Sequence, residues 1–223
     1  MSLIKVKKMS FGYLKSIEVL KNINLNIKER EFVCIVGENG SGKSTLAKCI
    51  LGLNKINNGS IECKYKMGYL PQLTEIQNHF PATVEEIVLS GTIGTEIFKI
   101  WYSKADNKKA KDIMEELNIY SIRRKSFSEL SGGQKQRVLI ARALCTTDKI
   151  MILDEPINGL DPKIAMETYE LLNRLNKINK MTIIMISHDV DRAIKFCTRI
   201  IRMENGEICF DGKPSDYKIG GVN

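Results

Sequence analysis

The stretch GENGSGKS, from Gly37 to Ser44, constrains the fold of this chain more than any other part of its sequence. A β-rich run, Glu31 to Val36, leads directly into it, and the residues from Ser44 to Leu53 favour a helix. A glycine-rich turn between a strand and a helix lets successive backbone N–H groups point at a phosphate. The pattern therefore predicts an α/β fold that binds a nucleoside triphosphate at the end of one strand.

The side chains of this loop indicate how the phosphates are held. Lys43 places a positive charge at the β- and γ-phosphate oxygens, and the hydroxyl of Ser44 can ligate Mg²⁺. The glycines allow the backbone to turn inward toward the same oxygens. The expected nucleotide contacts are Gly37, Glu38, Asn39, Gly40, Ser41, Gly42, Lys43, Ser44 and Thr45.

The second half of the chain alternates between strand-like and helical patterns. Ile150 to Leu153, Thr182 to Ile186 and Arg199 to Met203 read as buried strands. Asn205 and Gly206 then predict a tight hairpin turn. Between the first two strands, one helical face carries Ile164, Leu171, Leu172, Leu175 and Ile178. This alternation predicts a mostly parallel sheet covered on both sides.

The first half is less regular. Apolar stretches around 3–7, 18–27 and 60–63 indicate strands, and Met67 to Leu70 indicates another. The pattern then becomes helical, with apolar residues at helical spacing at Ala110, Ile113, Met114 and Leu117 and over Val138 to Cys145. We expect one domain, 1–223, in which the core covers about 1–71 and 147–223 and a helical insertion covers about 72–146.

Two adjacent carboxylates, Asp154 and Glu155, end the strand-like run from Ile150, and Pro156 follows them. Beside a phosphate-binding loop, the first acid suits the surroundings of the metal ion, and the second can accept a proton from the attacking water. His188 follows another strand in the same way, so it can contact the γ-phosphate or organise the base. A lone histidine is more often structural, but the position of His188 relative to the other motifs favours the functional interpretation.

A second glycine-rich helix start lies at Ser131, Gly132, Gly133 and Gln134, but no lysine follows it. Ser131 is a good N-cap, and the two glycines allow close backbone approach. An isolated Ser-Gly-Gly is commonly only a helix entry. Together with the other motifs, it predicts a contact with a triphosphate that this chain does not hold by itself.

Composition limits the other possibilities. The formal net charge is +8, with 34 Lys and Arg against 26 Asp and Glu, but the lysines are scattered and favour a solvated surface over nucleic-acid or lipid binding. No apolar run approaches the roughly 20 residues of a membrane span, and no signal-peptide pattern opens the chain. The six cysteines form no CxxC pair, so we expect buried reduced thiols in a cytoplasmic protein.

In this order, the motifs resemble those of the ATP-binding subunit of ABC transporters over nearly the whole chain. The matching elements are GENGSGKS (Walker A), Gln72 in YLPQ (Q-loop), LSGGQ at 130–134 (signature), IMILDE at 150–155 (Walker B), Gly159 to Asp161 (D-loop) and SHD at 187–189 (H-loop). The resemblance implies an α/β P-loop NTPase with a mostly parallel central sheet, an N-terminal antiparallel β subdomain and an inserted helical subdomain.

The resemblance also implies residue roles. It makes Glu155 the catalytic base, His188 a γ-phosphate switch, Gln72 a sensor of Mg²⁺ and of the membrane subunit, and Asp161 a contact across a dimer. Tyr13 would stack on the adenine of ATP. Phe11 competes for that role, although its alternation with Tyr13 on a strand suggests that Phe11 faces the core.

The resemblance implies partners as well. In this family two subunits pair head to tail, so Ser131, Gly132, Gly133 and Gln134 of one copy would close over the ATP bound by the other. The expected assembly is a homodimer in the ATP-bound state at the cytoplasmic face of the membrane. It would contain integral membrane permease subunits, with an extracytoplasmic substrate-binding protein and no nucleic acid.

The segment 72–91, with Phe80, Pro81 and a helix beginning near Thr83, looks like ATPases of zinc and manganese importers. The expected function is therefore ATP hydrolysis that energises metal uptake. One alternative is an importer ATPase for another substrate. A less favoured one is a soluble ABC-type ATPase that acts on nucleic acid or ribosomes, since coiled coils, zinc modules and a second ATPase domain are missing from the sequence.

Overall fold

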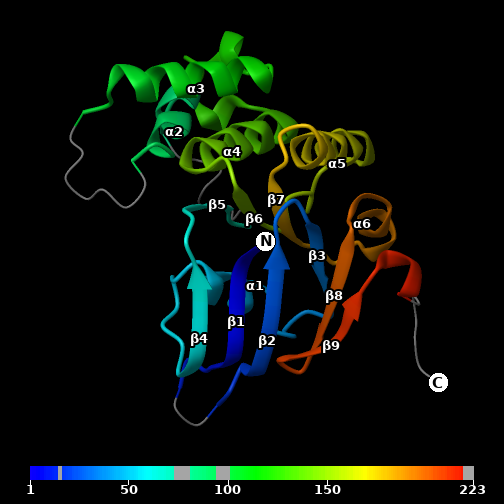
Figure 1. Cartoon of the computed structure of the whole chain (residues 1–223). Helices are drawn as coiled ribbons and strands as arrows, with labels where there is room; N and C mark the ends of the chain where they lie inside the picture. The colour runs from blue at the N-terminus through cyan, green and yellow to red at the C-terminus, as the bar shows by residue number, and fades with distance from the viewer. Residues whose placement is uncertain (15–16, 73–80, 94–100, 218–223) are drawn as a thin grey trace.

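The computed structural model describes residues 1–14, 17–72, 81–93 and 101–217 (Figure 1). Within these ranges no helix is both long and apolar enough to cross a membrane. The strands are β1 (Ser2–Phe11), β2 (Leu20–Lys28), β3 (Phe32–Val36), β4 (Asn58–Cys63), β5 (Met67–Leu70), β6 (Ile150–Asp154), β7 (Thr182–Ile186), β8 (Arg199–Glu204) and β9 (Glu207–Gly212). The α-helices are α1 (Lys43–Ile50), α2 (Val84–Ser90), α3 (Lys104–Glu116), α4 (Gly132–Thr146), α5 (Pro162–Lys177) and α6 (Val190–Phe196).

A six-stranded sheet forms the centre of the molecule, with the strand order β5-β6-β7-β3-β8-β9. All neighbours in it are parallel except β8 and β9, which form a hairpin around Asn205 and Gly206. The predicted parallel sheet and hairpin are confirmed. Because β3, β6 and β7 run side by side in the same direction, the residues that follow them meet at one edge of the sheet.

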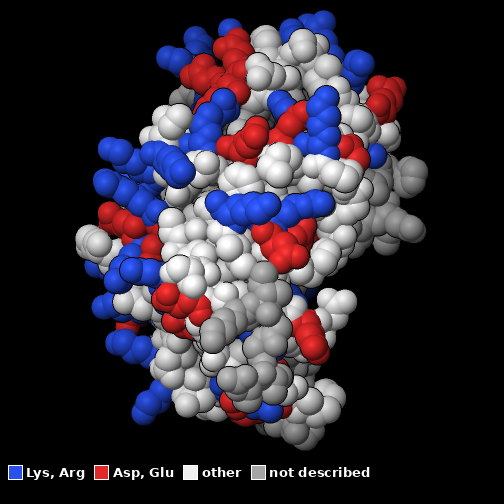
Figure 2. Space-filling model, turned by 90° about the vertical axis from the view of Figure 1, so that its right-hand side faces the viewer, with Lys and Arg blue, Asp and Glu red and all other residues white. Residues whose placement is uncertain are grey.

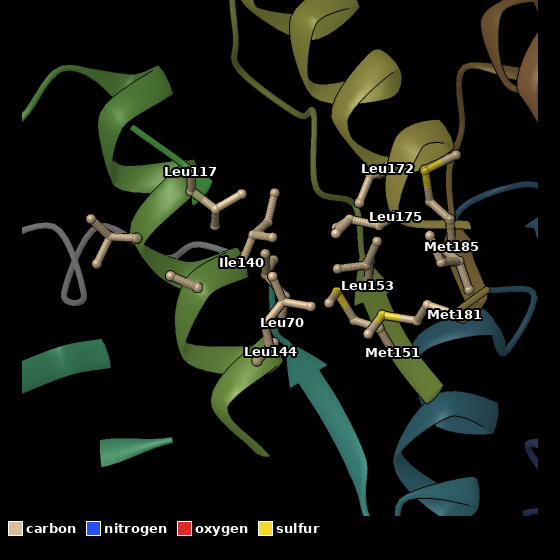
Figure 3. Packing of buried hydrophobic residues seen from close by; sticks show 14 of the residues in the cluster. Leu70, Leu117, Ile140, Leu144, Met151, Leu153, Leu172, Leu175, Met181 and Met185 are labelled. Atoms are coloured by element: carbon tan, nitrogen blue, oxygen red, sulfur yellow. The ribbon is translucent and has the colours of Figure 1, made fainter. Parts of the chain in front are cut away.

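The central strands are buried on both faces, which explains their continuous apolar sequences. Along β3, Cys34 packs on one side of the sheet and Val33 on the other, and the same alternation recurs in β6 and β7. One side is covered by α2 to α6, and Figure 3 shows Ile140 and Leu144 of α4 close to Leu70 of the sheet. The other side is covered by α1 and a second sheet.

This second sheet has the order β2-β1-β4 and is antiparallel throughout, as expected for the N-terminal part. Its inner side chains alternate along β1 and β2 and join the same core as α1. Figure 1 shows it in front of α1, below the helical part of the molecule. Helices α2, α3 and α4 pack on one another at the other end, whereas the proposed boundaries of 72–146 stay a prediction.

Several local expectations need correction. Ile178 does not share the buried face of α5: it follows the last helical residue and is 70% exposed, while Met181 is buried in its place. Helix α1 ends at Ile50 and not at Leu53, because Gly52 adopts a positive φ of 73°. Helix α6 was not predicted. Phe80, in the importer-like segment 72–91, lies outside the described residues.

The charged residues do not form one continuous basic surface on the face that Figure 2 shows. Lys and Arg side chains are most frequent along one edge, and Asp and Glu side chains lie among them over much of that face. Of the cysteines, Cys34, Cys49, Cys145 and Cys197 are buried and Cys63 is half-buried, as expected for reduced thiols, but Cys209 is exposed.

Candidate functional site: a phosphate-binding cleft

The loop after β3 has the shape that the sequence predicts for a phosphate site. Gly37 adopts a φ of 146°, and a Cβ atom there would lie 2.2 Å from the carbonyl oxygen of Met203, so only glycine fits. Gly42, with a φ of 101°, is the N-cap of α1 and offers no side chain to its first N–H groups. These N–H groups are therefore free of a side-chain cap at the position where an anion would bind.

Lys43 is held inside this loop. Its Nζ atom donates hydrogen bonds to the carbonyl oxygens of Gly37, at 2.8 Å, and Glu38, at 2.7 Å. Burial lowers the pKa of Lys43, while the nearby charges of Glu155 and Asp154 act in the opposite direction. The ammonium group is thus partly desolvated and bound only to neutral carbonyls, which suits it to receive the negative oxygens of a phosphate.

A cleft of about 710 Å³ opens at this loop. It joins the expected loop residues to the polar residues that follow β5, β6 and β7, so segments far apart in the sequence form one site. Its lining consists of Val19, Asn39, Gly40, Gly42, Lys43, Ser44, Thr45, Gln72, Glu155, Asn158 and His188. Val19 and Asn158 were not predicted.

Ser44 and Asp154 form the best candidate for a metal site. Ser44 Oγ donates a hydrogen bond of 2.9 Å to Asp154 Oδ1, and Asp154 is only 3% exposed. Burial raises the pKa of Asp154, and the Ser44 hydrogen bond opposes this shift. A hydroxyl and a carboxylate beside a phosphate cleft are the hard oxygen ligands that Mg²⁺ prefers, so the residues present fit this ion.

Glu155 lines the cleft in a strained conformation, with a φ of 50°. Its backbone N–H donates to the carbonyl oxygen of Ile186, which fixes it to the neighbouring strand. Its Oε2 atom meets Asn158 Nδ2 at 3.0 Å, Gln72 Nε2 at 3.3 Å and His188 Nδ1 at 3.4 Å. The structure thus brings together the three predicted residues Glu155, Gln72 and His188.

The two aromatic candidates occupy different environments. Phe11 is 7% exposed and packs in the core, as expected, but strand alternation is not the reason. Residues two apart lie on the same face of a strand, and the two side chains differ because β1 ends at Phe11, before Tyr13. Tyr13 is 64% exposed, and its ring lies edge-on to that of Phe11 with centroids 4.9 Å apart. Its hydroxyl is 3.4 Å from Thr45 Oγ1, at the border of the cleft. Tyr13 therefore has a ring face available for stacking, which stays a prediction.

The second glycine-rich helix start also has its predicted local form. Ser131 caps α4 in a reciprocal capping box with Gln134: Ser131 N–H donates to Gln134 Oε1 at 3.1 Å and Gln134 N–H donates to Ser131 Oγ. A Cβ atom at Gly133 would lie 2.8 Å from Ile164 Cγ2, so this helix end packs closely on the start of α5. None of residues 130–134 lines the cleft of its own chain.

Asp161 serves as the N-cap of α5, where its Oδ1 atom accepts hydrogen bonds from the N–H groups of Lys163 and Ile164. The family resemblance implied only a contact across a dimer for this residue. The cap is an additional structural role, which the Asp-Pro start of the helix signals in the sequence.

Comparison with known proteins identifies the family. The family model described as "ABC transporter" matches residues 20–158. A Thermotoga maritima protein named "Probable metal transport system ATP-binding protein" is 38% identical and covers 90% of this chain and 81% of its own length. The "Zinc uptake system ATP-binding protein ZurA" of Listeria monocytogenes is 36% identical, with 97% and 88% covered.

A relative with a different substrate is equally similar: the "Phosphonates import ATP-binding protein PhnC" of Staphylococcus aureus is 37% identical, covering 97% of this chain and 91% of its own. A solved dimeric ATP-binding cassette bound to ADP and Pi matches with a TM-score of 0.79 and 30% identity over 96% of this chain and 100% of that one. With the family model and these relatives spanning the cleft and its motifs, the chain belongs to the ABC transporter family, as one of its ATP-hydrolysing subunits.

Proposed function

We propose that this subunit energises an importer of zinc or manganese ions through ATP-driven closure of a homodimer. Two of the similar relatives carry names that refer to metal or zinc transport. The phosphonate relative, at 37% identity, supports an importer for another substrate nearly as well. The metal is then cargo of the membrane complex, and the described part of this chain contributes the ATP cleft.

The observation that carries the catalytic part of the proposal is the position of Glu155. Its carboxylate follows β6 directly, lines the same cleft as Lys43, and has three polar side chains within 3.4 Å of one oxygen. A carboxylate that lines a phosphate cleft can accept the proton of a water molecule that attacks the γ-phosphate. Lys43 then binds the β- and γ-phosphate oxygens, and His188 contacts the γ-phosphate from the opposite loop.

Three side chains would hold Mg²⁺ directly or through water: Ser44, Asp154 and Gln72. The Nε2 atom of Gln72 is directed to Glu155, which leaves its amide oxygen for the metal. The chemistry that this ion supplies when bound is neutralisation of the phosphate charge. Tyr13 stacks on adenine, a contact worth roughly 1–3 kcal/mol for bases on aromatic rings in general.

The partner copy is required because the signature residues do not reach the cleft of their own chain. In a head-to-tail homodimer, Ser131 and Gly132 of one copy would face the γ-phosphate on the other copy's Lys43. Asp161 would add a contact across the same interface. The complex further includes integral permease subunits and an extracytoplasmic substrate-binding protein, with this chain at the cytoplasmic face of the membrane. The scattered charge offers no support for an action on nucleic acid.

The variant Glu155→Gln tests the proposal. Because Gln keeps the size of the side chain but cannot accept the proton, we expect ATP binding to persist while hydrolysis falls by about 10²–10⁴-fold, the usual contribution of a general base. The variant should then accumulate as a dimer in saturating ATP and Mg²⁺, measured by light scattering after gel filtration. A variant that stays monomeric, or hydrolyses ATP normally, contradicts the shared-site mechanism.

The transported substrate needs a separate test. Deletion of the gene should lower cellular uptake of radioactive zinc or manganese, and the wild-type gene should restore uptake while the Glu155→Gln gene should not. Unchanged metal uptake, together with lost growth on a phosphonate as the phosphorus source, would favour the alternative importer.

A further inference from the structure

The turn that carries Glu155 contains a polar residue, Asn158, that belongs to none of the motifs named in the sequence. Asn158 lines the cleft, and its Nδ2 atom donates a hydrogen bond of 3.0 Å to Glu155 Oε2. This bond is shorter than the contacts from Gln72, at 3.3 Å, and His188, at 3.4 Å. Asn158 is thus the nearest of the three side chains that contact this oxygen.

The backbone fixes Asn158 to the same turn. Its N–H donates to the carbonyl oxygen of Glu155 at 3.2 Å, so the segment 155–158 closes as a turn with Pro156 inside it. Gln72 and His188 belong to segments that follow other strands, β5 and β7. Among the three contacts of Glu155 Oε2, only the one from Asn158 comes from the turn that also carries Glu155.

The distribution of contacts over the two oxygens gives this bond a consequence. The polar side chains that approach the Glu155 carboxylate all meet Oε2, and the described residues give Oε1 no hydrogen bond. A carboxylate anchored through one oxygen presents the other in a fixed direction. In the cleft that Glu155 lines, that direction determines whether Oε1 can take a proton from the attacking water.

We propose that Asn158 is a positioning residue for ATP hydrolysis, which anchors Oε2 of Glu155 so that Oε1 faces the attacking water. This inference rests on the proposed role of Glu155 as the base. Because Asn158 contacts neither Lys43 nor Ser44 in the structure, it should affect the rate of hydrolysis and leave nucleotide affinity unchanged.

The test compares Asn158→Ala, Asn158→Ser and Asn158→Asp with the wild type. Alanine removes the side-chain bond and leaves the backbone bond, and a bond to a charged group at an exposed position is worth about tenfold in rate. We therefore expect kcat to fall about tenfold for Ala, less for Ser, which keeps a donor, and more for Asp, whose charge repels Glu155. Dissociation constants for ATP, measured by fluorescence titration, should stay within about twofold in all three.

Two controls separate this role from a structural one. Asn179→Ala makes the same change at an exposed asparagine beyond α5 and should leave kcat unchanged. In a Glu155→Gln background, Asn158→Ala should cause no further loss in single-turnover rate, because both changes act through one carboxylate.

Wild-type kcat in the Ala and Asp variants, with Glu155→Gln inactive, would overturn the role of Asn158 alone. An equal loss of ATP affinity, or an additive loss in the double variant, would also overturn it. Normal hydrolysis by Glu155→Gln would instead remove the proposed function on which this inference rests.

Discussion

Replacing Ser44 with alanine removes one hydrogen bond, and the structure allows its effect on stability to be worked out. Ser44 Oγ donates to Asp154 Oδ1 at 2.9 Å, and Asp154 is 3% exposed. A hydrogen bond to a charged group contributes about 1.5–3 kcal/mol. Alanine has a higher helix propensity than serine, which stabilises the first turn of α1 by about 0.5 kcal/mol. The loss of the hydrogen bond is the larger effect, and we expect Ser44→Ala to lower the free energy of unfolding by about 1–2.5 kcal/mol.

The same argument fixes the dependence on pH. Burial raises the pKa of Asp154 above its ordinary value of 3.8, and the Ser44 hydrogen bond acts against that rise because it stabilises the charged form. The stability that Ser44 contributes is thus fully present when Asp154 is ionised, and it is lost as the pH falls through the pKa of Asp154 in the folded state. As the pH is lowered, the difference in the free energy of unfolding between Ser44→Ala and the wild type should begin to shrink at a higher pH than an ordinary aspartate would give.

Urea unfolding without nucleotide or divalent metal, followed by circular dichroism at a series of pH values, measures both effects. Ser215→Ala is a matched control, since Ser215 Oγ donates to Asp216 Oδ1 at 2.8 Å with both residues exposed. We expect Ser215→Ala to lower the free energy of unfolding by less than about 0.5 kcal/mol. Equal losses in the two variants, or a loss in Ser44→Ala that does not change with pH, would refute the reasoning.

Two other predictions use different parts of the molecule. The variant Gly132→Asp should keep its fold and its ATP affinity, but its turnover should fall at least about 100-fold. The reason is that the new carboxylate would meet the partner's γ-phosphate, and like charges brought together cost several kcal/mol. Gly132→Ala is the control, since a Cβ atom there would lie 3.3 Å from Leu160 Cδ2 and needs only a small adjustment. Normal hydrolysis by the Asp variant would contradict the signature assignment. Iodoacetamide at pH 8 should label exposed Cys209 first, since burial raises the pKa of Cys49 and of Cys145 to about 11. Mass spectrometry that finds Cys49 or Cys145 labelled as fast as Cys209 would contradict this.

The sequence predicted those parts of the site that depend on short segments after strands. The loop before Lys43 and the residues Glu155 and His188 each follow a buried apolar run, and parallel strands bring such positions to one edge. Asn158 could not be assigned in this way, because it does not directly follow a strand. Its bond to Glu155 forms across the turn 155–158, in which Glu155 has a positive φ that its residue type does not signal. Ile178 was misplaced because the apolar spacing continues past Lys177, where the helix ends, and Ile178 is its exposed C-cap.

The segment from Glu155 to Ile164 connects the cleft of this chain to its signature helix start, Gly132 and Gly133. At its start, Glu155 and Asn158 line the cleft that we propose binds the chain's own nucleotide. At its end, Leu160 and Ile164 pack on Gly132 and Gly133, which would contact the partner's nucleotide. All of these contacts come from one segment of ten residues, Glu155 to Ile164, and side chains that pack closely have little room to move independently. A displacement of the base is therefore expected to shift the signature helix as well, which would couple hydrolysis in one cleft to the closure of the other.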